Sequence, residues 1–161
     1  MAWSPLRFSK KHKGKTLPQV LFNDPDWFFW AYEDEKLFND SPPVLRREAD
    51  MLYAKARSIR IPQAGSEPRL VEYAFYPGTQ KFCGFEIVEE NRPSHEGSTA
   101  THRSRHIDMS IPRRQADYDK LGCKILVDEL KHLFFGDSGT RMTKQRCEAF
   151  FDDAANFERN G

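Results

Sequence analysis

Apolar residues repeat at three- and four-residue intervals through the first third of the chain, and this spacing predicts three helices. The first covers residues 17–22, the second 25–37 and the third 42–56. Each follows a Thr, Asp or Ser whose side chain can accept a free backbone N–H, and each has a proline in its first turn. The N-terminal part is therefore expected to be a helical module.

The apolar spacing changes from helical to alternating after residue 69, which is typical of β-strands. Segments 70–76 and 81–90 flank the sequence Pro-Gly-Thr-Gln and predict a hairpin. Segment 90–105 is polar and is expected to form a loop. Segment 106–111 alternates again and predicts a third strand.

Helical spacing returns at 116–135 and 142–157. The order of elements predicts an α+β fold: an N-terminal helical module with a basic turn, then a three-stranded antiparallel sheet and two C-terminal helices. Segment 61–69 holds two prolines and a glycine without periodicity, which is typical of a linker. We therefore expect two domains, residues 1–62 and 67–161.

Charge is unevenly distributed along a chain whose net charge is only +1. Residues 1–22 carry five lysines and arginines and no acid, whereas residues 23–40 carry six acids and one lysine. Such separation can build a local positive surface that the net charge conceals.

The three cysteines, Cys83, Cys123 and Cys147, are far apart and form no C-x-x-C pair, so they predict neither a disulfide framework nor a zinc site. No apolar run has the length of a signal peptide or of a membrane span, which needs about 20 residues. We expect a cytoplasmic protein with reduced thiols, without a cofactor and without a membrane partner.

The tripeptide Gly-Lys-Thr at 14–16 matches the end of a phosphate-binding P-loop. That motif begins with a second glycine five residues earlier, because its backbone N–H groups must wrap the phosphates. Here Ser9 occupies that position. The apolar run before Asp-Glu at 128–129 resembles a second nucleotide-binding motif, in which an apolar strand ends in acidic residues. The apolar positions continue beyond it at helical spacing, however, and predict a helix. Nucleotide hydrolysis is not favoured.

The same segment fits another pattern: an aromatic residue, a basic turn with glycine, a short helix containing leucine, then Asp-Pro and a helix with tryptophan. The matching residues are Phe8, Lys10, His12, Lys13, Gly14, Lys15, Leu17, Asp24, Pro25 and Trp30. Over residues 6–60 the chain thus resembles the small C-terminal domain of exodeoxyribonuclease X-like proteins and its uncharacterised phage and bacterial relatives. Ser9 replaces a common glycine, and the turn is one residue longer. No three-carboxylate exonuclease domain precedes the segment, so the resemblance implies an accessory role directed at nucleic acid.

These observations favour non-catalytic binding of nucleic acid, with DNA favoured over RNA. A glycine turn can present lysines outward, where each ammonium group approaches a phosphate and releases counterions. Arginine suits bidentate phosphate contacts. The candidate binding residues are Lys10, Lys11, His12, Lys13, Gly14, Lys15, Arg103, Arg105, Arg113 and Arg114. The sequence leaves open whether the arginines lie beside the turn. It also leaves open whether the lysines are simply solvated charges on an exposed turn, without a role in binding.

A protein-interaction module of a phage or mobile element is an alternative, because the acidic segment 23–40 and many aromatic residues suit docking to a protein. The four aromatics at 27–30 surround a helix, and we expect them to be core residues. Exposure of one or two of them for base stacking is the alternative.

A metal-dependent phosphodiesterase is a third, less favoured function. His102, His106 and Asp108, with His95 nearby, offer imidazole and carboxylate groups that suit zinc or manganese, and a bound ion could activate water. The segment has no H-E-x-x-H arrangement and runs from a loop into a strand. The sequence therefore favours a protein that is not an enzyme.

Overall fold

The computed structural model describes residues 2–62, 68–93 and 100–158. The N-terminal helices are α1 (Leu17–Asn23), α2 (Pro25–Phe29) and α3 (Pro43–Ala56), with a π-helical turn η1 (Trp30–Asp34) and a 3₁₀ turn η2 (Leu37–Asp40) between the last two. The three predicted helices are thus confirmed, except that the second is α-helical only as far as Phe29 and continues as the π-helical turn η1. Lys36 then adopts a left-handed conformation with φ of 50°, which ends the helical path.

The aromatics at 27–30 divide between core and surface. Phe28 and Phe29 are fully buried, as expected, whereas Trp27 is half-buried and 37% of Trp30 is exposed.

The predicted hairpin is confirmed by β2 (Arg69–Phe75) and β3 (Phe82–Glu89), which pair antiparallel. The third strand of the sheet is β4 (Ala100–Ser104), and the strand order is β3-β2-β4. The prediction of a loop over 90–105 is therefore wrong at its C-terminal end; residues 94–99 lie outside the described part. Residues 101–104 are Thr, His, Arg and Ser, so this strand shows no alternation of apolar and polar residues that would reveal it.

The strand predicted at 106–111 is also wrong in its extent. Only β5 (His106–Ile107) is a strand, and it pairs with β1 (Ile59–Arg60) rather than with the three-stranded sheet. The chain then enters the short helix α4 (Ile111–Gln115).

The C-terminal helices are α5 (Lys120–Phe135) and α6 (Lys144–Asp152), followed by a 3₁₀ turn η3 (Ala154–Asn156). Helix α5 begins four residues later than predicted because Asp119 caps it, accepting the Gly122 N–H at 2.9 Å. Both predicted helices are present, but the second, predicted over 142–157, is α-helical only over Lys144–Asp152.

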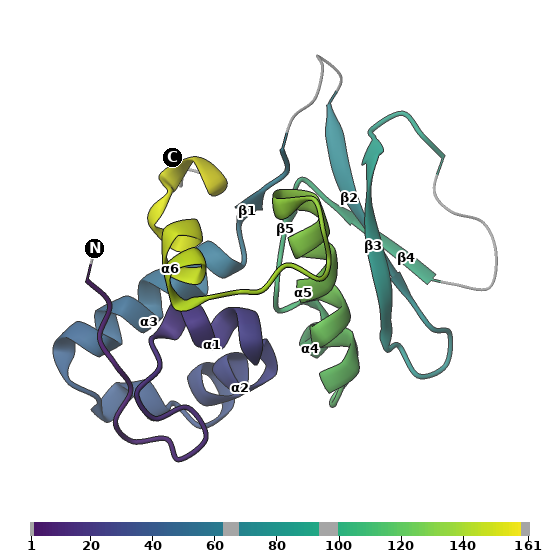
Figure 1. The fold of residues 1–161 in the computed structure, drawn as a ribbon. Helices are drawn as coiled ribbons and strands as arrows, with labels where there is room; N and C mark the ends of the chain where they lie inside the picture. Colours follow the sequence, from purple (N-terminus) through teal and green to yellow (C-terminus); the bar gives the residue numbers. More distant parts are fainter. Residues whose placement is uncertain (1, 63–67, 94–99, 159–161) are drawn as a thin grey trace.

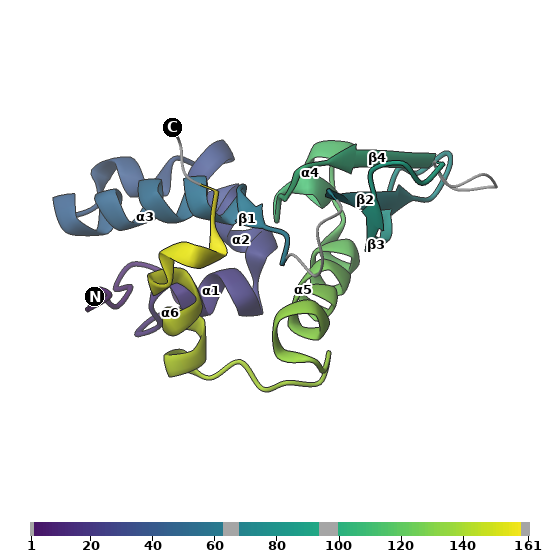
Figure 2. The ribbon, with the colours of Figure 1, turned by 90° about the horizontal axis from the view of Figure 1, so that it is seen from above.

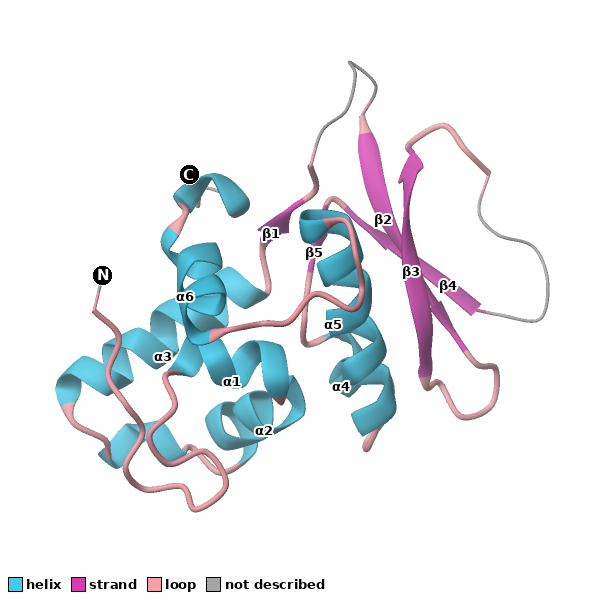
Figure 3. Cartoon of the chain, viewed as in Figure 1, coloured by secondary structure: helices cyan, strands magenta, loops and turns pink. Residues whose placement is uncertain are grey.

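Helix α5 lies between the N-terminal helices and the sheet, packing against β3 on one side and α2 on the other (Figures 1 and 2). Helix α6 returns to pack against α1, and Ile59 forms a bridge with Phe157 near the C-terminus. Figure 3 shows the resulting α+β arrangement, with the N-terminal helices on one side, the three-stranded sheet on the other, and α5 and the β1–β5 pair between them. The division into domains 1–62 and 67–161 stays a prediction, and residues 63–67 lie outside the described part.

No helix in the described ranges combines the length and the apolar character that a membrane crossing requires; α5, at 16 residues, is shorter than the roughly 20 needed.

Candidate nucleic-acid interface

The basic turn is a loop closed by backbone hydrogen bonds at its two ends. Leu6 donates its N–H to the Lys15 carbonyl at 2.9 Å and accepts the Gly14 N–H at 2.8 Å. Gly14 has φ of 83°, a left-handed conformation that residues with a side chain rarely adopt. These contacts fix both ends of the turn to the buried Leu6 and give it a defined shape.

Asp24 anchors the turn to the first turn of α2. Its carboxylate accepts the Trp27 N–H at 3.4 Å, which caps the helix, and lies 3.0 Å from His12 Nε2. Lys11 Nζ is 2.7 Å from the same carboxylate oxygen. His12 is 98% buried, and its ring contacts the Trp27 ring edge-on at 4.9 Å between centroids. His12 therefore holds the turn in place and does not present its ring at the surface.

Electrostatic effects at this anchor follow from burial and from the paired charges. Burial raises the pKa of Asp24, but the hydrogen bonds from Lys11 and His12 outweigh it, so the pKa is lowered overall. Burial lowers the pKa of His12 below its usual value, against the opposing effect of Asp24. An ionised Asp24 requires the proton of neutral His12 to sit on Nε2, which leaves Nδ1 buried without a partner among the described residues.

We expect stability to fall as the pH falls below about 6.5, the ordinary pKa of histidine, because the unfolded chain then binds a proton that the folded His12 resists. The melting temperature should drop more steeply between pH 7.5 and 5.5 in the wild type than in His12→Gln. The other histidines are present in both proteins and cancel in the comparison. Identical pH profiles would contradict this account of His12.

Three lysines of the turn have no ion-pair partner within the described ranges. Lys10 and Lys13 are exposed and Lys15 is half-buried, whereas Lys11 is held by Asp24. The turn thus presents three ammonium groups on a backbone that is fixed at both ends.

Helix α5 adds lysines that the sequence analysis did not identify. Lys120, Lys124 and Lys131 recur at i, i+4 and i+11, a spacing that places them on one face of a helix. They line a pocket of about 440 Å³ between α1, α2 and α5. Lys131 is mostly buried beside Asp128, but Lys120 and Lys124 are exposed. Lys120 lies near Lys11, so this helix face adjoins the turn, and the two together are called the basic surface below. The carboxylates of Asp24, Asp26 and Asp128 line the same pocket.

The predicted arginine cluster does not join that surface as a set of free cations. Arg103 Nε lies 2.6 Å from the nearly buried carboxylate of Glu72, within the sheet. Arg105 is 77% exposed and pairs with Glu90 at 3.3 Å. Both therefore have carboxylate partners of their own.

Arg113 and Arg114 bind the acidic segment 23–40. Arg113 pairs with Asp26 at 2.9 Å and also with Asp34, and Arg114 lies 3.4 Å from Glu33. The basic helix α4 and the acidic segment, far apart in the sequence, thus neutralise each other at the junction of the two halves.

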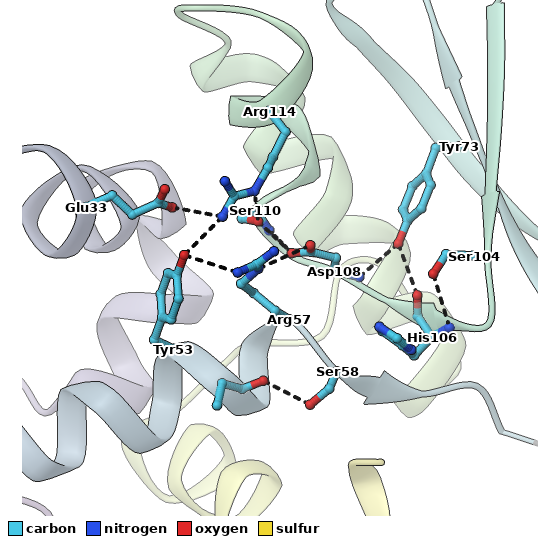
Figure 4. A network of polar contacts seen from close by, with 11 residues as sticks. Glu33, Tyr53, Arg57, Ser58, Tyr73, Ser104, His106, Asp108, Ser110 and Arg114 are labelled. Atoms are coloured by element: carbon cyan, nitrogen blue, oxygen red, sulfur yellow. Dashed lines mark hydrogen bonds and ion pairs between the residues drawn. The ribbon is translucent and has the colours of Figure 1, made fainter. Parts of the chain in front are cut away.

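Figure 4 shows the rest of this junction, including two of the proposed metal ligands. The Asp108 carboxylate accepts from Arg57 Nε at 3.4 Å and from the Ser110 hydroxyl at 2.6 Å. The Tyr73 hydroxyl accepts the Asp108 N–H at 2.8 Å and donates to the His106 carbonyl at 3.4 Å. Asp108 is thus committed to an internal network.

His102 stacks on Tyr73 at 6.1 Å between ring centroids, on β4. Within the described ranges, no group of three or more His, Cys, Asp or Glu side chains is placed to hold a metal ion. His95 lies outside those ranges.

No protein-family model matches the chain, and neither a curated protein nor a solved structure matches it. The resemblance to the exodeoxyribonuclease X-like C-terminal domain therefore stays a prediction from the motif.

Proposed function

We propose that the protein binds nucleic acid without catalysis, through the basic surface formed by the turn and one face of α5. The observation that carries the proposal is that Lys10, Lys13 and Lys15, on a fixed turn, have no ion-pair partner among the described residues. Exposed Lys120, with Lys124 one turn further along α5, lies near Lys11 of the same turn. An ammonium group without an internal partner loses no ion pair when it binds a phosphate. Each such contact releases counterions and contributes to affinity without reading sequence.

The four arginines of the predicted cluster, Arg103, Arg105, Arg113 and Arg114, are left out of the proposed contact surface, except as structural support. Arg103, Arg113 and Arg114 have carboxylate partners, so binding phosphate would cost an existing ion pair. As part of the same proposal, we favour DNA over RNA and a cytoplasmic location, where the three free thiols stay reduced.

We expect the triple variant Lys10→Ala/Lys13→Ala/Lys15→Ala to bind a single-stranded oligonucleotide on the order of 100-fold more weakly at 0.1 M salt, because about three phosphate contacts are lost. The dependence of log affinity on log salt should flatten by about two to three. Fluorescence anisotropy at several salt concentrations measures both quantities.

The matched control removes the same charge elsewhere: Lys81→Ala/Arg141→Ala/Lys144→Ala, at three exposed positions outside this surface. It should bind like the wild type, and both variants should melt normally. Equal affinity of the turn variant and the wild type would rule out the turn as the binding site.

Docking to a protein is a second candidate function, supported by one observation. An apolar groove of about 800 Å³ opens between the N-terminal segment and α3. Co-purification of a partner whose binding survives the triple lysine variant, with no oligonucleotide binding, would favour it.

A further inference from the structure

The apolar groove adjoins the basic turn directly. It is lined by residues of the N-terminal segment, of η2 and its flanks, and of the first turn of α3, including Pro5, Phe8, Leu37, Pro42, Val44 and Leu45. Phe8 stands immediately before the turn and keeps 45% of its surface exposed, and its ring meets Phe38 edge-on at 5.9 Å. Phe38 is buried, so one edge of the Phe8 ring is fixed while part of the ring stays open to solvent.

Charges are arranged unequally around this groove. Arg7 lines the side that continues into the cationic turn, and it has no ion pair within the described ranges. Glu35, Lys36 and Asp40 line the side formed by η2 and its flank, which thus carries two carboxylates and one ammonium group. A ligand that matches this arrangement carries negative charge along one edge, an apolar face in the middle, and hydrogen-bond donors on the far edge.

We propose that the groove accepts unpaired bases of a single-stranded nucleic acid, with one base stacked on Phe8; the proposal rests on the nucleic-acid binding inferred above. The phosphates lie toward Arg7 and Lys10, and the base faces contact the apolar floor. Exocyclic amino groups of the bases can donate to Glu35 and Asp40, as they do to carboxylates elsewhere.

A duplex does not fit this arrangement, because its bases are stacked inside and its phosphates would also meet the two carboxylates. Stacking on an aromatic ring tolerates any base, since every base has a π-face. An apolar peptide matches the floor of the groove, but it has no feature that uses the run of cations from Arg7 to Lys15. The charges therefore favour the single strand.

The test uses the full chain and two labelled single-stranded oligonucleotides of equal length, one with normal bases and one with abasic residues at its centre. The wild type should bind the normal strand about 5- to 150-fold more tightly than the abasic strand, the range that stacking of one base supplies. In Phe8→Leu, which keeps an apolar side chain against Phe38, this preference should fall several-fold. The salt dependence should stay unchanged, because the lysines remain.

The outcomes separate this inference from the proposed function. Equal affinity of the wild type for both strands, or an unchanged preference in Phe8→Leu, would overturn base stacking while salt-dependent binding survives. Duplex binding as tight as single-strand binding would also overturn base stacking in the groove. The groove would then suit an apolar peptide. Absence of binding to every oligonucleotide would overturn the proposed function and this inference together.

Discussion

Replacing Asp24 with alanine is expected to lower the free energy of unfolding by about 2–4 kcal/mol, because one carboxylate performs three tasks. It caps α2 through the Trp27 N–H, receives the buried His12 ring and pairs with Lys11. Loss of a cap costs about 0.5–2 kcal/mol, and leaving a buried donor such as His12 Nε2 unpaired costs about 1–3 kcal/mol. Urea denaturation followed by tryptophan fluorescence measures the change.

Asp24→Asn is the matched control for that prediction. Asparagine is as good a cap as aspartate and keeps an acceptor for His12, but it removes the charge that holds Lys11. Asp24→Asn should lower the free energy of unfolding clearly less than Asp24→Ala does. If both variants lose the same free energy of unfolding, the effect comes from the charge of Asp24. If Asp24→Ala is as stable as the wild type, the turn does not depend on this anchor.

Replacing Arg103 with alanine is expected to lower the free energy of unfolding by about 3–5 kcal/mol, because it leaves the carboxylate of Glu72 buried without its cation. Glu72 is only 3% exposed, and its Oε2 lies 2.6 Å from Arg103 Nε across the β2–β4 pair. Thermal and urea unfolding of the variant measure the loss. The double variant Glu72→Ala/Arg103→Ala should regain part of the lost stability, because no unpaired carboxylate is then buried.

This prediction also separates the two interpretations of Arg103. In the sequence it is one of a basic cluster that suits phosphate, whereas in the structure its guanidinium is mostly buried beside Glu72. A stable Arg103→Ala variant with much weaker oligonucleotide binding would contradict the structural role and return Arg103 to the binding surface.

The starts of α1 and α2 could be predicted from the sequence because their determinants are local. The cap and proline pairs before α1 and α2 mark those starts within one residue, and they need no knowledge of the rest of the chain. Strand β4 could not be found in this way. Its polar side chains lie against β2, with Arg103 in an ion pair with Glu72 and His102 stacked on Tyr73, and these contacts depend on the sheet.

The candidate site was only partly predictable for a related reason. The lysines of the turn lie in one short segment, so their grouping followed from the local sequence. The ion pair of Lys11 with Asp24 and the half-burial of Lys15 did not. The arginines find partners far along the chain, such as Arg113 with Asp26, and no local pattern shows that they are neutralised. Lys120 and Lys124 belong to the surface only because α5 packs beside α2.

Binding of a labelled single-stranded oligonucleotide at several salt concentrations tests the central claim most directly. With Lys10, Lys13, Lys15, Lys120 and Lys124 each contacting one phosphate, the log of the affinity should fall with the log of the salt concentration with a slope of about −3.5. A slope near zero, or no binding at low salt, would contradict phosphate recognition by this surface.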